Sequence, residues 1–258
     1  MNEVAAAAAS AASRLISRVE GTRLRLQLSP LPAGLGETEI QLDGDELDLV
    51  VRGWSGRALA ALRVLTLSRR RDPPRVVALS ALPSPASGAA PLYVELETRL
   101  PGGGLRWTMD LQAMRSGHAS DRVRSLVRRV RLRGHRLTPA GDALERIQLD
   151  STSPLEHEEA CDLTLALLDH YPKLLALAAS EPPPLEPQTC ASQRRWREAL
   201  RDHLQTGSAI GRIRGPQVNG RLLAHELVPD VPRRSGVNPV VPAARCPLAL
   251  ASMGAPPD

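Results

Sequence analysis

The 258-residue sequence contains no phenylalanine and almost no lysine. A core therefore has to be built mainly from Leu, Val and Ala, which bury less area per residue than aromatic side chains do. Lys173 is the only lysine, so arginine carries almost all of the net charge of +5. The few aromatic rings belong to Trp54, Trp107, Trp196, Tyr93 and Tyr171.

Cysteine is also scarce: Cys161, Cys190 and Cys246 are odd in number and far apart. This spacing fits neither a disulfide framework nor a zinc site, and it favours a reducing compartment. Residues 1–13 are rich in Ala and Ser and lack the basic start and leucine-rich stretch of a secretory signal peptide. No run approaches the roughly 18 apolar residues of a membrane span. The sequence therefore predicts a cytoplasmic protein without a transmembrane segment.

The stretch 22–63 alternates between apolar and polar residues and then changes its spacing. The apolar members of the alternating part are Leu24, Leu26, Leu28, Ile40, Leu42, Leu47, Leu49 and Val51. Period-two alternation is typical of half-buried strands, and Asp43-Gly44 between two such runs predicts a hairpin with a type I′ turn. Ser55 then predicts the start of a helix that carries Leu59, Leu62 and Leu65 on one side.

A second unit of the same kind follows at residues 92–134. Residues 92–100 and 105–112 alternate on either side of a Pro-Gly-Gly-Gly turn, which predicts a hairpin with one apolar and one charged face. A helix is expected to begin at Ser120, with Val123, Leu126 and Val127 on one side, and to end near Gly134.

Together these patterns predict an α+β fold with two antiparallel β-hairpins, each followed by a helix, then a helical segment and a disordered Pro-rich tail. The expected divisions are a flexible N-terminus (1–21), an α+β domain (22–150), a helical region with a Pro-rich linker at 181–187 (151–227) and a disordered tail (228–258). The side chains expected to point inward are Leu24, Leu26, Ile40, Leu47, Leu49, Val94, Leu96, Trp107 and Met109.

The link between the first two predicted strands carries a Pro-x-x-Leu-Gly turn ahead of a strand that contains Glu and Ile. Its matching residues are Pro32, Leu35, Gly36, Glu39 and Ile40. Here the chain resembles the C-terminal domain of flagellar hook-length control proteins and their type III secretion relatives. The resemblance covers residues 22–65 and implies a hairpin followed by a helix.

The resemblance also implies a non-enzymatic export-control function, as a substrate-specificity switch or adaptor that contacts a protein of the secretion export apparatus. Pro32, Leu35, Gly36 and Glu39 would form the partner-binding turn. The Ala/Ser-rich start is compatible with export by a type III system. Any other α+β domain with a Pro/Gly-rich turn remains an alternative.

The densest positive run lies in the predicted helix 120–136 and suggests a second function. Its arginines are Arg122, Arg124, Arg128, Arg129, Arg131 and Arg133. Such a run could bind nucleic-acid phosphates or an acidic protein surface, so the alternative is a basic nucleic-acid-associated regulator. It could equally be the solvated face of an amphipathic helix. No aromatic residue interleaves the run, which argues against stacking on single strands.

No motif indicates catalysis or a cofactor. The pair His157 and Cys161 has the i, i+4 spacing of a metal site on a helix, but no further ligands stand nearby in the sequence. A buried, inert thiol at the acidic start of a helix explains the pair better than a metal site does. No nucleophile elbow, phosphate loop or zincin motif is visible. The sequence therefore predicts a non-enzymatic protein without metal or cofactor.

Overall fold

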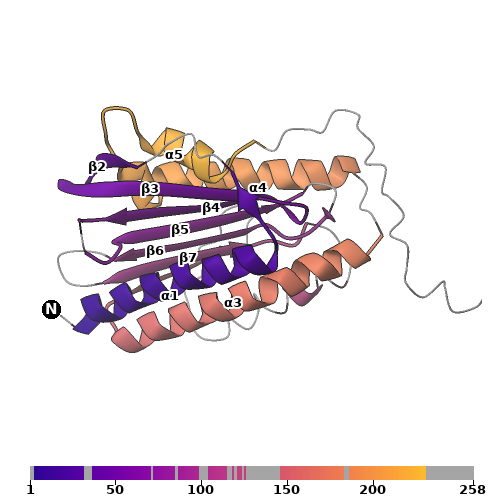
Figure 1. Cartoon of the computed structure of the whole chain (residues 1–258), viewed down its shortest axis with the longest axis horizontal. Helices are drawn as coiled ribbons and strands as arrows, with labels where there is room; N and C mark the ends of the chain where they lie inside the picture. The colour runs from indigo at the N-terminus through magenta and orange to yellow at the C-terminus, as the bar shows by residue number, and fades with distance from the viewer. Residues whose placement is uncertain are drawn as a thin grey trace, which may run out of the picture.

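One antiparallel sheet runs through the whole fold, with helices packed on both of its faces (Figure 1). The computed structural model describes residues 3–31, 37–70, 72–84, 87–98, 104–114, 118, 121–123, 125, 146–182 and 186–230. The strands are β1 (Ser29–Pro30), β2 (Thr38–Leu42), β3 (Asp45–Ser55), β4 (Leu59–Ser68), β5 (Val76–Pro83), β6 (Leu92–Thr98), β7 (Leu105–Leu111) and β8 (Arg146–Ser151). They lie in the order β1-β3-β4-β5-β6-β7-β8, and β2 also pairs with β3.

The helices form two outer layers. They are α1 (Glu3–Arg25), α3 (Pro154–Ser180), α4 (Glu186–Thr206), the 3-10 helix η3 (Ala209–Arg212) and α5 (Gly220–Leu227). Helices α1 and α3 cover one face of the sheet, and α4, η3 and α5 cover the other (Figure 1). In the described ranges, no helix is long and apolar enough to cross a membrane.

Each face of the sheet has its own apolar core. On the α1/α3 side, Val94, Leu96 and Trp107 pack against buried residues of both helices. On the α4 side, Leu47 and Leu49 pack with α4 and α5. The two predicted hairpins thus direct their apolar faces toward opposite layers. The prediction that residues 40, 47, 49, 94, 96, 107 and 109 point inward is confirmed.

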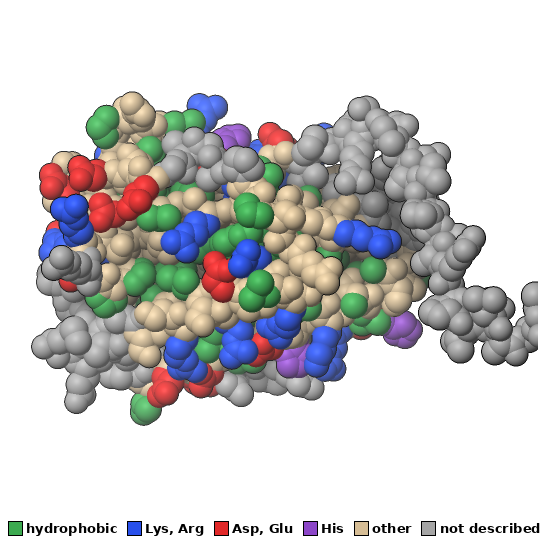
Figure 2. Space-filling model, in the orientation of Figure 1, with side chains coloured by type: hydrophobic (Ala, Val, Ile, Leu, Met, Phe, Trp, Pro, Cys, Tyr) green, Lys and Arg blue, Asp and Glu red, His purple; other side chains and the backbone are tan. Residues whose placement is uncertain are grey.

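Ion pairs join α1 to α3 at the surface. Asp169 binds Arg18 at 2.8 Å and Arg25 at 3.0 Å, and Asp162 binds Arg14 at 2.5 Å. Figure 2 shows the basic side chains gathered along these two helices. Because such exposed pairs contribute little each, the apolar contacts beneath them hold the layer in place.

The predicted arrangement of two hairpin-helix units is wrong, because one continuous sheet of eight strands replaces it. The predicted helix after Ser55 is strand β4, a central strand paired with both β3 and β5. Its side chains are buried on both faces, so its apolar residues follow one another closely. A short apolar run of this kind cannot be told from a buried helix by its spacing alone.

The predicted strand at 22–28 is wrong as well, since helix α1 continues to Arg25. Alanine-rich residues 5–9 favour helix, and Leu15 and Val19 continue its buried face at a spacing of four. Leu24 therefore projects into solvent, with 66% of its surface exposed. The alternation of Leu24 and Leu26 is too short to outweigh this longer helical pattern.

The predicted turn at Asp43-Gly44 is present between β2 and β3. Asp43 has φ 54° and Gly44 has φ 86°, as a type I′ turn requires. The second predicted hairpin is also present, as β6 paired with β7. Most of the predicted helix 120–136 and of the predicted tail 228–258 lies outside the described residues.

Candidate functional site

The charged face of the β6–β7 hairpin is buried beneath α4 and the segment 206–212. We call its four acidic or phenolic residues, Tyr93, Glu95, Glu97 and Asp110, the buried acidic row. All four have 0% of their surface exposed. Tyr93 lies opposite Asp110 in the strand register, and Glu95 lies opposite Thr108. Carboxylates are rarely buried unless hydrogen bonds or charges compensate for lost water, so each one here calls for an explanation.

Glu95 lies at the centre of the row and accepts three hydrogen bonds. Its Oε2 accepts one from the hydroxyl of Tyr93 at 2.6 Å. Its Oε1 accepts one from Ser208 Oγ at 2.8 Å and one from the backbone N–H of Ala209 at 3.1 Å. Because Tyr93 and Ser208 are hydroxyls that can also accept, the site accommodates both protonation states of Glu95.

Burial raises the pKa of Glu95 above its ordinary value, and the nearby charge of Glu97 raises it further. The hydrogen bonds from Tyr93, Ser208 and Ala209 oppose this rise but do not cancel it. A carboxyl whose pKa is raised keeps its proton to a higher pH than an exposed carboxyl does and can then donate it.

Asp110 connects the row to α4, because the indole Nε1 of Trp196 donates to its Oδ1 at 3.1 Å. Beside it, Thr108 is buried with 1% of its surface exposed. Within the described part of the chain, no group forms a hydrogen bond with Thr108 Oγ1. This interface therefore retains hydrogen-bonding capacity that the described residues do not use.

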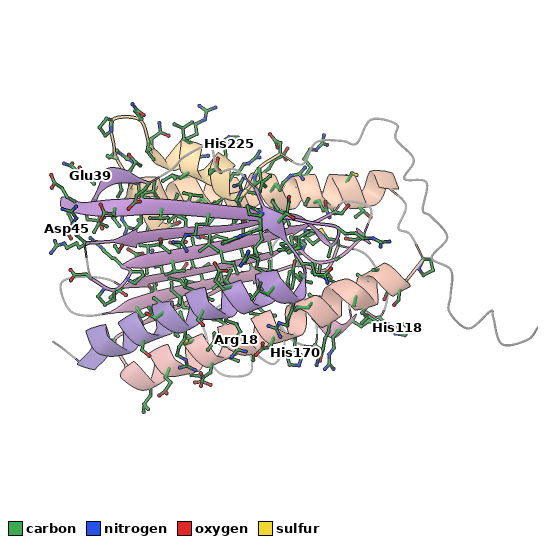
Figure 3. All side chains as sticks on the ribbon, viewed as in Figure 1. Arg18, Glu39, Asp45, His118, His170 and His225 are labelled. Carbon is green, nitrogen blue, oxygen red and sulfur yellow. The ribbon has the colours of Figure 1, made fainter. Side chains whose placement is uncertain are left out.

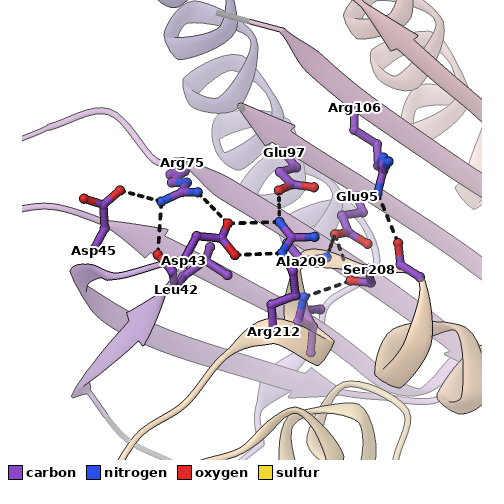
Figure 4. Close-up of polar contacts among 12 residues, drawn as sticks. Leu42, Asp43, Asp45, Arg75, Glu95, Glu97, Arg106, Ser208, Ala209 and Arg212 are labelled. Atoms are coloured by element: carbon purple, nitrogen blue, oxygen red, sulfur yellow. Dashed lines mark hydrogen bonds and ion pairs between the residues drawn. The ribbon is translucent and has the colours of Figure 1, made fainter. Parts of the chain in front are cut away.

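An ionic network leads from Glu97 to the surface (Figure 4). Arg212 of η3 forms an ion pair with Glu97 and also binds Asp43 at 3.0 Å. Asp43 in turn binds Arg75 at 2.9 Å, and Arg75 binds Asp45 at 2.7 Å. The network joins the β2–β3 turn to η3 and fixes the segment that covers the row.

The predicted partner-binding turn lies mostly outside the described residues, which include neither Pro32, Leu35 nor Gly36. Glu39 is exposed on β2, at the same end of the sheet as Asp45 (Figure 3). The export-control function, and the resemblance that implies it, stay predictions.

The predicted basic patch is described only at Arg122, which is exposed. Arg124, Arg128, Arg129, Arg131 and Arg133 lie outside the described residues. The nucleic-acid alternative also stays a prediction. The structure does not bring Arg122 and Glu39 into one site by any contact among the described residues.

Histidines and cysteines do not gather into a site in the described part of the chain. His118, His170 and His225 lie far apart (Figure 3). Among the described residues there is no group of three or more His, Cys, Asp or Glu that could hold a metal ion. Cys161 packs against α1, where its Sγ lies 3.8 Å from the carbonyl oxygen of Ala11, and burial raises the pKa of its thiol.

The fold is similar to that of a solved enzyme. The crystal structure of selenomethionine phytochromobilin synthase from tomato, in complex with biliverdin, matches with a TM-score of 0.54 and 15% sequence identity. The match covers 82% of this chain and 78% of that chain. At this identity, the likeness concerns the fold alone. No family model matches the sequence, and no curated protein is significantly similar to it.

The buried acidic row was not singled out from the sequence. Tyr93, Glu95 and Glu97 alternate with apolar residues, and this pattern indicates a strand with one face in water. The covering residues, Trp196 and Ser208, come about a hundred positions later in the chain, so no local pattern connects them to the hairpin.

Proposed function

We propose that this protein binds a linear tetrapyrrole of the biliverdin class between the sheet and α4. The observation that carries the proposal is the buried acidic row on the sheet face that α4 covers. A linear tetrapyrrole presents ring N–H donors, a flat apolar surface and propionate carboxylates. Buried carboxyl groups complement the ring N–H donors, and the apolar residues around Trp196 complement the flat surface.

Glu95 has the role of an acid in this proposal. Its raised pKa keeps the carboxyl protonated to a higher pH than an exposed glutamate, so it can give a proton to a basic ring nitrogen. Thr108 Oγ1 offers a further hydrogen bond next to Glu95. The biliverdin in the similar solved structure supports the choice of ligand class, although that molecule belongs to the tomato enzyme.

A titration with biliverdin, followed by its visible absorbance, tests the proposal. We expect a saturable spectral change with a dissociation constant in the micromolar range or tighter. Glu95→Gln should weaken binding about tenfold, because a hydrogen bond to a charged or acidic group is lost. Glu46→Gln, at an exposed position on β3, is the matched control and should bind as the wild type does.

Two results contradict the proposal. One is the absence of any saturable spectral change with the folded wild-type protein. The other is an equal loss of affinity in Glu95→Gln and Glu46→Gln, which would place the bound pigment elsewhere on the surface.

The adaptor function is a second candidate, and the exposed carboxylate of Glu39 on the edge strand β2 favours it. A protein partner could reach this side chain without disturbing the core. Glu39→Arg should then abolish capture of a purified export-apparatus protein while leaving biliverdin binding intact. Equal capture by wild type and variant would count against the adaptor function.

A further inference from the structure

Two N–H donors on α4 have no hydrogen-bond partner in the described part of the chain. Gln193 and Arg197 are four residues apart, so their side chains lie one above the other on the helix. Among the described residues nothing accepts a hydrogen bond from Gln193 Nε2 or from Arg197 Nε, and both atoms are buried. Gln193 as a whole has only 4% of its surface exposed, so its amide group is withdrawn from bulk water.

The guanidinium of Arg197 is half withdrawn from solvent. Burial lowers its pKa, and the neighbouring charge of Arg201 acts in the same direction, whereas Asp230, Cys190 and Glu198 act in the opposite direction. Asp230 forms its ion pair with Arg201, at 2.8 Å. Within the described ranges, no carboxylate forms an ion pair with Arg197. Arg197 Nε and Gln193 Nε2 are thus two buried donors for which the described residues supply no acceptor, as expected of a site for an anion.

We infer that Gln193 and Arg197 bind a carboxylate group of the ligand. One guanidinium and one amide match the single charge and two oxygens of a carboxylate. A phosphate carries more charge and more acceptor oxygens than these two donors can satisfy. Arg197 keeps part of its surface in solvent, so a ligand can reach it from outside.

The position of the pair connects it to the buried acidic row. Trp196 lies between Gln193 and Arg197 in the sequence and donates its hydrogen bond to Asp110. The carboxylate site therefore lies beside the row, on the same interface of α4 with the sheet. The choice of a propionate of a linear tetrapyrrole as its natural occupant rests on the proposed function. The carboxylate site itself rests on the two donors.

The first measurement uses a carboxylate alone. Thermal unfolding is followed in sodium propionate and in sodium chloride at equal ionic strength. Propionate should raise the melting temperature of the wild type and of the control Arg194→Gln, whose side chain is exposed and pairs with Glu198. Arg197→Gln should abolish the rise, and Arg197→Lys, which keeps the charge, should retain part of it.

The second measurement compares biliverdin with its dimethyl ester, in which both propionates are blocked. The free acid should bind the wild type about tenfold more tightly than the ester, as expected for loss of a charge-assisted hydrogen bond. Arg197→Gln and Gln193→Leu should bring the two affinities close together. The unfolding curves of the same variants show whether each is folded.

The outcomes separate this inference from the proposed function. A propionate effect that depends on Arg197 supports the carboxylate site even if biliverdin does not bind, in which case only the proposed function fails. A difference in affinity between biliverdin and its dimethyl ester that depends on Arg197 supports the carboxylate site, even if propionate alone binds too weakly to stabilise the protein. The inference is overturned if propionate has no such effect and biliverdin either does not bind or binds as well as its ester.

Discussion

The indole Nε1 of Trp196 on α4 donates a 3.1 Å hydrogen bond to Asp110 on β7, and both side chains are fully or almost fully buried. This contact joins residues 86 positions apart in the chain. It holds α4 over the charged face of a hairpin that would otherwise be solvated. The layer that α4 forms on the sheet therefore depends on a polar contact as well as on apolar packing.

A double-mutant cycle on this contact should give a clear coupling. Trp196→Phe removes the donor and Asp110→Ala removes the acceptor of this hydrogen bond, and the coupling between them should be about 1–3 kcal/mol. Urea unfolding of the wild type, both single variants and the double variant measures it. Additive effects of the two substitutions would mean that the contact does not hold α4.

Glu95 should make the protein less stable as the pH rises. Its folded-state pKa is raised above the ordinary value of 4.5, so the folded protein holds this proton more tightly than the unfolded chain does. The resulting stability is complete below about pH 4.5 and is lost as the pH rises through the folded-state pKa.

Glu95→Gln is neutral at every pH and should not show this decline. As the pH rises from acid to neutral, the free energy of unfolding of the variant should therefore increase relative to that of the wild type. A constant difference between the two proteins across that range would show that Glu95 is not held protonated.

Gly53 on β3 makes room for the buried Arg63 of β4, its register partner. A β-carbon at position 53 would lie 2.8 Å from Cζ of Arg63 and displace the guanidinium from Glu226, which it binds at 3.2 Å. Gly53→Ala should lower the free energy of unfolding by about 1–3 kcal/mol. Gly21→Ala is the matched control, since nothing lies within 4 Å of its added methyl group.

The control should change stability in the opposite direction, because alanine suits a helix better than glycine by about 0.5–1 kcal/mol. Chemical denaturation of the two variants gives both values. Equal stabilities for both alanine variants would show that Arg63 moves aside freely.

Arg212 compensates the buried carboxylate of Glu97. Arg212→Gln should destabilise the protein by about 2 kcal/mol, less than for a wholly buried pair because Arg212 is partly open to solvent. Arg214→Gln should change stability by less than about 0.5 kcal/mol, since the exposed Arg214 side chain donates to the carbonyl oxygens of residues 211 and 213, next to it in the sequence. Thermal melts that fall equally for both variants would refute this role of Arg212.

The two hairpins were predictable because their signals are local. Alternation at 38–51 and 92–111, together with positive-φ residues at Asp43-Gly44, determines strand, turn and register from neighbouring residues alone. Which face of each hairpin a helix covers was not predictable, because the same alternation fits a sheet face in water and a sheet face beneath a helix.

In strand β4 and helix α1, by contrast, the local pattern led to a wrong prediction. In β4, burial on both faces erases the alternation, and Leu59, Leu62 and Leu65 happen to follow a helical spacing. In α1, a short alternation at residues 24–28 lies at the end of a longer helical pattern. The buried acidic row was missed for a further reason: its covering residues Trp196 and Ser208 belong to a distant part of the chain, and only the packed structure brings them onto Asp110 and Glu95.

Hydrogen–deuterium exchange with and without biliverdin shows where on the protein the pigment binds. We expect slower exchange in peptides from 186–212 and 92–111 when biliverdin is present, and unchanged exchange in peptides from α1 and α3. Slower exchange confined to α1 and α3, or no change in any peptide at saturating biliverdin, would contradict a tetrapyrrole site between the sheet and α4.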